Sequence, residues 1–262
     1  MDTKQPDALA AARSRLRLSK MLAAAGIVLL LLTYLLGPLF PYRSTAGYET
    51  EINNSYQPFS FFQLAKNEQG RLNEQSLTAY LSGYHSMPTW HVSLEAPQYP
   101  KVTFPDGIPV YFNLTRFTGE VQEMNTINHY IGMEPMEVGA PWERRLVPFI
   151  VLVFVISMAV FIVYEGPGWW ILGIGPALLP VYFLAVFSYW LYWFGHNLHE
   201  WGAFTIKPFM PTVLGNGKVA QFTTHSYPSA GFYLLLAVLA VMLLAVFIKR
   251  RALNELRSPP AK

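Results

Sequence analysis

The chain has 262 residues, of which 52% are hydrophobic and 13% are charged, and its formal net charge is +3. It contains no cysteine, which excludes disulfides, iron–sulfur clusters and covalent haem of the Cys-x-x-Cys-His type. No Gly-x-x-x-x-Gly-Lys-Ser/Thr segment occurs, which excludes nucleotide hydrolysis through a P-loop. Because the positive charge comes mostly from the two chain ends, we expect it to attract anionic lipid and expect no nucleic-acid partner.

Four apolar stretches are long enough to cross the roughly 30 Å hydrocarbon core of a bilayer as helices. They cover residues 21–40, 146–164, 168–194 and 231–248. The first stretch could also be a cleaved signal peptide, but it is long and ends in Gly-Pro-Leu-Phe-Pro instead of a small-residue cleavage pattern, so we expect a retained anchor. The sequence therefore predicts an integral membrane protein with four transmembrane α-helices.

Lysine and arginine cluster in the two terminal tails, residues 1–20 and 249–262. Because basic residues near the ends of spans stay on the cytoplasmic side, both termini are predicted to be cytoplasmic. The chain is then a multi-pass protein of the cytoplasmic (inner) membrane, with residues 41–145 and 195–230 on the periplasmic or extracellular side. Arg144 and Arg145 oppose the rule locally, although long translocated domains tolerate such charges.

Residues 41–145 are predicted to form a small extracytoplasmic α+β or β-rich domain between helices 1 and 2. Alternating residues on both sides of Asp106-Gly107 favour a hairpin, and residues 90–94 favour a further strand. A helix is expected over residues 72–84. Residues 195–230 are longer than a connection needs and rich in aromatic residues, so we expect an ordered loop packed on this domain.

All six histidines lie outside the interiors of the four spans, and five of the nine methionines accompany them in the outer segments. Imidazole and thioether ligands together suit copper, and without cysteine no thiolate can take part. A copper site on the outer side is thus the main chemical hypothesis.

The first candidate site lies at the end of the third span. If that helix continues past Gly195, then His196, His199 and Glu200 share one helical face at i, i+3 and i+4. The following loop could return Met210 and His225 to the same surface as further ligands. The competing interpretation is an interfacial belt of aromatic and histidine anchors.

The second candidate combines His129, Met133 and Met136, whose donors would suit Cu(I). The same methionines could equally be core packing under the second span. A third and looser cluster consists of His85, Met87 and His91.

Two segments carry a resemblance to a known group of proteins. Asn128-His-Tyr-Ile-Gly-Met133 and the run from Phe209 to Thr224 resemble segments of uncharacterised membrane proteins associated with copper delivery and nitrous oxide reductase maturation. The resemblance implies a copper-handling accessory protein, with His129, Met133 and Met136 as its binding residues. It also implies weak, transferable binding, because the cysteine ligands common in copper chaperones are missing.

Three classes of function follow from these features. The first is a copper-binding accessory or assembly factor for an extracytoplasmic metalloenzyme, and the second is a non-catalytic subunit or scaffold of a larger respiratory or oxidoreductase membrane complex. The third, a small transporter permease, lacks a cytoplasmic coupling helix between residues 164 and 168. An enzyme in its own right would need a catalytic metal at His196, His199 and Glu200, and we do not expect one. The expected partners are the lipid bilayer and a membrane or extracytoplasmic metalloenzyme.

Overall fold

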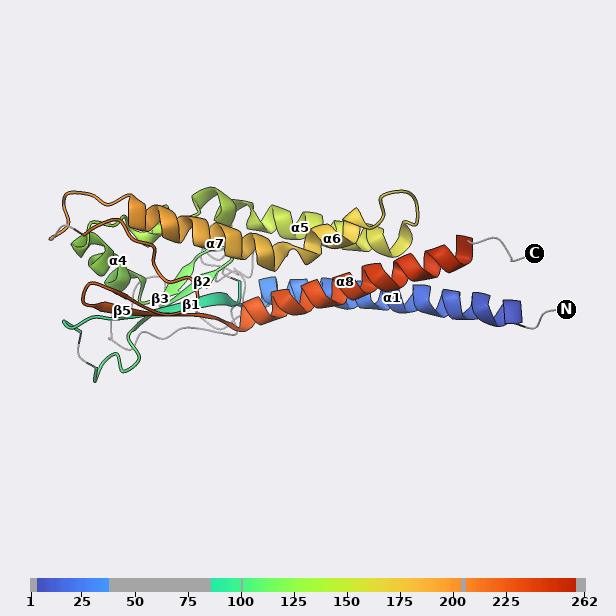
Figure 1. The fold of residues 1–262 in the computed structure, drawn as a ribbon, viewed down its shortest axis with the longest axis horizontal. Coiled ribbons are helices and arrows are strands. Elements are labelled where there is room, and N and C mark those ends of the chain that lie inside the picture. Colours follow the sequence, from blue (N-terminus) through green and yellow to red (C-terminus); the bar gives the residue numbers. More distant parts are fainter. Residues whose placement is uncertain (1–3, 38–85, 100, 204–205, 258–262) are drawn as a thin grey trace, which may run out of the picture. The chain divides into compact units, whose positions relative to one another are not determined.

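The computed structural model describes residues 4–37, 86–99, 101–203 and 206–257 (Figure 1). The helix predicted over 72–84 and the candidate ligand His85 lie outside these ranges. The helices are α1 (Lys4–Leu35), α4 (Val121–Tyr130), the 3-10 helix η2 (Met136–Val138), α5 (Pro141–Val163), α6 (Ile171–Ala177), α7 (Leu179–His196) and α8 (Ala230–Arg257). The strands are β1 (Pro88–Glu95), β2 (Ile108–Asn113), β3 (Phe117–Gly119), β4 (Gly215–Val219) and β5 (Phe222–Pro228).

Three of the described helices, α1, α5 and α8, are long and apolar enough to cross a membrane, and α6 with α7 makes a fourth if the bent pair is one span. The third predicted span is therefore broken, with a bend of 43° between α6 and α7. Pro176 lies inside α6, and Pro180 follows one turn later. Because Pro180 has no N–H, it cannot donate to the carbonyl of Pro176, and the helical ladder is interrupted there.

The described residues divide into two compact units. The helical unit contains most of α1, the later part of α5, α6, the start of α7 and most of α8. The sheet unit contains the five strands, α4, the beginning of α5 and the rest of α7.

Within the helical unit, α1 and α8 are antiparallel neighbours (Figure 1). Arg15 pairs with Glu255 at one end of the contact. Further along, a Cβ added to Gly26 would lie 2.9 Å from the sulfur of Met242. Buried residues recur at spacings of three and four on both helices, and many are small. They include Ala12, Ser19, Ala23, Gly26 and Leu30 on α1, and Leu235, Val238, Met242, Ala245, Lys249 and Ala252 on α8.

Lys249 is the first residue of the predicted cytoplasmic tail, yet it lies inside α8 and is fully buried. Its ammonium donates to the carbonyls of Phe161 and Tyr164, the latter at 2.9 Å, and lies 4.3 Å from the centroid of the Phe161 ring. A cation at a helix C-terminus satisfies carbonyls that the helix itself leaves open. Lys249 therefore joins α8 to the end of α5.

The five strands form one antiparallel sheet in the order β3-β2-β1-β5-β4. The strand expected over residues 90–94 is confirmed as part of β1. The hairpin expected around Asp106-Gly107 is wrong, because residues 101–107 form turns and the partner of β2 is β1. Gly107 has φ +83°, and a Cβ there would lie 2.8 Å from the carbonyl carbon of Leu94. The glycine thus serves the turn before β2 and its close approach to β1.

The segment predicted as a packed loop, residues 195–230, supplies β4 and β5 to this sheet. One face of the sheet lies on a hydrophobic core formed with α4, η2 and the end of α7. Core members include Leu94, Ile108, Val110, Met124, Ile127, Met133, Met136, Phe194 and Phe222. Because side chains alternate along a strand, the residues between them face the other side, which carries the polar groups described next.

Candidate functional site

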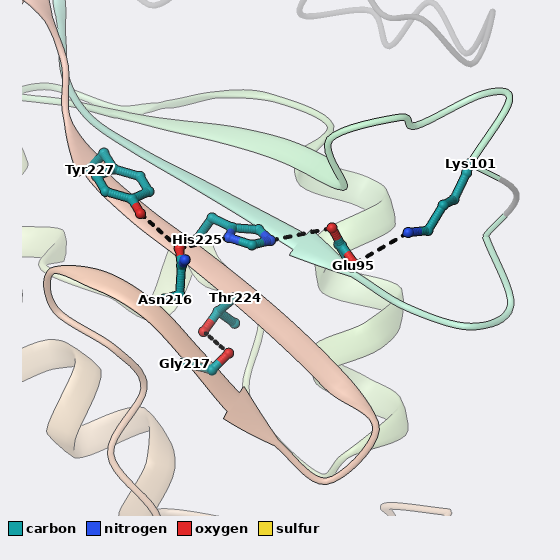
Figure 2. Close-up of polar contacts among 7 residues, drawn as sticks. All are labelled: Glu95, Lys101, Asn216, Gly217, Thr224, His225 and Tyr227. Carbon is teal, nitrogen blue, oxygen red and sulfur yellow. Dashed lines mark hydrogen bonds and ion pairs between the residues drawn. The ribbon is translucent and has the colours of Figure 1, made fainter.

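The polar face of the sheet collects side chains from three adjacent strands. His225 on β5 lies opposite Ser93 on β1 and opposite Asn216 on β4. His91 and Glu95 stand two residues to either side of Ser93, so both are diagonal neighbours of His225. Figure 2 shows His225 between Asn216 and Glu95, with Lys101 beyond Glu95.

The hydrogen bonds of His225 determine which of its ring nitrogens carries a proton. The Asn216 Oδ1 accepts a bond from the Tyr227 hydroxyl at 2.7 Å and lies 2.8 Å from the His225 Nδ1. An amide oxygen only accepts, so Nδ1 carries the hydrogen. In the neutral ring Nε2 then presents a lone pair. That lone pair faces the Glu95 Oε1 at 3.4 Å (Figure 2).

Two electron-pair donors that face each other at this distance attract a cation between them. A proton on His225 is one solution, and a metal ion is the other. With metal–ligand bonds of about 2.0–2.2 Å, a nitrogen–oxygen separation of 3.4 Å corresponds to an angle of roughly 110° at the metal, close to tetrahedral. His225 and Glu95 therefore have the spacing of two ligands of one ion.

His91 is a further imidazole on this face, diagonal to His225. Its ring stacks on Tyr111 with centroids 4.8 Å apart, and its Nε2 is buried without a hydrogen-bond partner among the described residues. Burial lowers the pKa of His91, and the charge of His225 lowers it further, while Asp106 raises it. Within the described part of the chain, however, no three His, Asp or Glu side chains are placed to share one ion. The pre-formed element is thus the His225–Glu95 pair.

A second polar cluster joins the two segments that the sequence proposed as separate sites. The His199 Nε2 lies 2.9 Å from Glu134, and its ring stacks on Trp201 with centroids 3.8 Å apart. His129 stacks on the same Trp201 at 6.0 Å. The backbone N–H of His199 also donates to the backbone carbonyl of Gly132 at 2.8 Å. The structure therefore brings His129 and His199 to one indole ring.

The helical face predicted for His196, His199 and Glu200 is not formed, because α7 ends at His196. Continuing the helix would require the His199 N–H to bond to the Gly195 carbonyl. That carbonyl instead accepts from Phe209 at 3.0 Å, while the His199 N–H bonds to Gly132. Glu200 lies exposed in the turn that follows.

The remaining predicted ligands are separated from one another. The Nδ1 of His196 bonds to the carbonyl of Tyr192 at 2.9 Å within its own helix. Met210 is exposed, and the residue before it, Phe209, bonds through its backbone N–H to the carbonyl of Gly195 near the end of α7. Met133 and Met136 are buried in the core, whereas His129 is exposed. The two thioethers therefore pack in the core and do not share a site with the His129 imidazole.

Glu95, Glu134 and Asn216 are the polar partners that sequence reasoning missed. No local motif marks them, because each meets its histidine through pairing of segments that are distant in the chain. Only the alternation of His91, Ser93 and Glu95 along one strand hinted at a shared polar face. No protein-family model matches the chain, and no curated protein or solved structure gives a significant match.

Proposed function

We propose that this protein is a membrane-anchored accessory protein that binds a copper ion transiently on the polar face of its sheet. The observation that carries the proposal is the His225–Glu95 pair, whose Nε2 and Oε1 atoms lie 3.4 Å apart while Asn216 holds the imidazole in place. Orientation of a metal-binding imidazole through its second nitrogen is a common feature of metal sites. His91, on the same face of β1, is the donor that completes the site once its ring moves from Tyr111 toward the pair.

The chemistry of these donors favours copper among the divalent first-row metals. Imidazole and carboxylate ligands bind Cu(II) more tightly than the other ions of that series, and nothing in the chain supplies thiolate. The resemblance carried by residues 128–133 and 209–224 also implies copper handling. With Met133 and Met136 in the core, we assign the role to nitrogen and oxygen donors in place of thioethers.

We further propose that the sheet lies on the extracytoplasmic side and that both termini are cytoplasmic, as the basic tails indicate. In that position the protein would load or assemble an extracytoplasmic metalloenzyme. A subunit or scaffold of a membrane complex that binds no metal is the competing function, and it predicts no copper response at all.

Titration of Cu(II) into the full-length protein in mild detergent tests the proposal, with bound copper measured by elemental analysis and its ligands by electron paramagnetic resonance. We expect one site with nitrogen and oxygen ligands. His225→Ala and Glu95→Gln should each weaken binding by more than about tenfold, since even indirect ligand partners have effects of that size.

His196→Ala is the matched control, because the His196 ring bonds to its own helix and lies outside the sheet. Near-ultraviolet circular dichroism checks that every variant is folded. Equal copper affinity in the wild type, His225→Ala and Glu95→Gln would remove the proposed site, and absence of binding to the folded wild type would favour the scaffold.

A further inference from the structure

Beside Glu95 the sheet unit contains a pocket of about 350 Å³. It lies where β1 ends and β2 begins, and the turn between β4 and β5 contributes Gln221 to its wall. Its volume is at the small end of the range for ligand sites, which suits a single side chain or a small molecule. Neither the copper proposal nor the hydrophobic core uses this space.

The two charged residues of the pocket, Glu95 and Lys101, differ in how firmly they are positioned. Glu95 is positioned by its strand, because it pairs with Thr223 of β5. Its Oε2 faces the Lys101 ammonium at 3.9 Å, and the Lys101 side chain is 80% exposed (Figure 2). An exposed ion pair of this length contributes little and exchanges readily with solvent. Lys101 is therefore a displaceable cation in front of a fixed carboxylate.

Part of the remaining pocket wall is apolar. Leu94, Phe104 and Ile108 are buried residues that form its inner surface. Tyr99 packs edge-on against Phe104, and its hydroxyl donates to Glu123, which holds the aromatic wall in position. An alkyl chain would fit against these groups with its charged end at Glu95, as long basic side chains do when they cover apolar surface.

We infer that this pocket binds an organic cation with an apolar stem, such as a lysine or arginine side chain of a partner or a small alkylamine. The head group takes the place of Lys101 at the Glu95 Oε2, and the stem lies on the apolar part of the wall beside Leu94 and Phe104. The inference does not depend on copper. Because Glu95 serves both sites, a metal ion at His225 and an organic cation in the pocket exclude each other.

Ligand-detected NMR on the full-length protein in detergent tests the inference with two probes of equal length and opposite charge, n-butylammonium and n-butyrate. We expect binding of the cation only. Glu95→Gln should weaken it by at least about tenfold, because a hydrogen bond to a charged acceptor is lost. Lys101→Met should strengthen it by about two- to fivefold, because the competing internal cation is removed.

The variant His225→Gln separates this site from the copper site. It should lose copper while keeping n-butylammonium, so failure of one proposal leaves the other standing. A peptide with a central lysine between alanines distinguishes the sources: tighter binding than the free amine indicates a partner side chain, and equal binding indicates a small molecule. Equal signals from both charged probes, or weaker cation binding in Lys101→Met, would overturn the inference.

Discussion

Replacing Gly132 by alanine perturbs the contact that holds His199 and Trp201 beside α4. Gly132 has φ +81°, and a Cβ there would lie 2.5 Å from the carbonyl oxygen of His199. The same glycine accepts the His199 N–H at 2.8 Å. A side chain at this position therefore strains the backbone and also pushes the two segments apart.

The expected loss of stability has two parts. An alanine in the left-handed region costs about 1–2 kcal/mol, and separation of the segments loses a backbone hydrogen bond of about 0.5–1.5 kcal/mol. Gly132→Ala should therefore destabilise the protein by about 1.5–3.5 kcal/mol. Gly215→Ala is the matched control, because Gly215 has φ +92° but, among the described residues other than its chain neighbours, nothing lies within 4 Å of an added Cβ. It should show only the backbone cost.

Thermal unfolding of the full-length protein in mild detergent gives the two stabilities, and hydrogen exchange identifies where the structure opens. In Gly132→Ala the amides of His199 and Ala203 should exchange faster, since both bond to the 130–132 segment. In Gly215→Ala they should not change. Equal destabilisation by the two variants, with unaltered exchange at His199, would refute the conclusion that the Gly132–His199 contact holds the two segments together.

Two further predictions concern pH and topology. Burial and His225 lower the pKa of His91 against the opposing effect of Asp106, so as pH falls the unfolded chain takes up a proton before the folded one, and stability should fall below about pH 6.5. Chemical denaturation at about pH 7.5 and 5 should show a smaller loss of stability in His91→Gln than in the wild type. An identical loss in both would contradict the burial argument. Because the chain lacks cysteine, a single cysteine can report on each side of the membrane. A cysteine at the fully exposed Val102 should react with an impermeant maleimide added to intact cells, whereas one at Arg251 should react only after lysis. The reverse pattern would invert the proposed topology.

The apolar helices were predictable from sequence because the length of a hydrophobic run can be read along the chain without knowing the fold. Each predicted stretch contains a helix or a helix pair, although α1 and α8 extend well beyond the apolar runs. Hydropathy says nothing about continuity of the backbone, so the break between α6 and α7 was missed. Pro176 and Pro180 were the available signal, since two prolines one turn apart interrupt a helical ladder.

The hairpin of β4 and β5 was missed for a different reason. Its turn is Ala220-Gln221, with Ala220 at φ +52°, where a glycine or asparagine would have marked a tight turn. The strand that follows reads Thr-Thr-His-Ser, which lacks apolar alternation because its outer face is polar and its inner face carries hydroxyl groups. Residues 215–228 therefore looked like a loop.

The candidate site depended on this hairpin and could not be found without it. Glu95 and His225 are 130 positions apart, and only the pairing of β1 with β5 brings them together. The sequence instead suggested that His196 and His199 share a helix, which fails because tertiary bonds from Phe209 and to Gly132 replace the helical ones. Local spacing predicts shared faces only while the local element continues.

The exposure of the proposed copper site decides what kind of site it is. The side chains of His225 and Glu95 are 27% and 36% exposed, so water screens their charge and can replace a ligand. Strand pairing and Asn216 nevertheless fix the direction of the imidazole, which reduces the entropy lost when a metal binds. Two well-placed ligands with a third donor close by favour rapid binding and rapid release. Such a balance suits delivery of an ion to another protein better than storage, because a store needs a closed ligand set that water cannot enter.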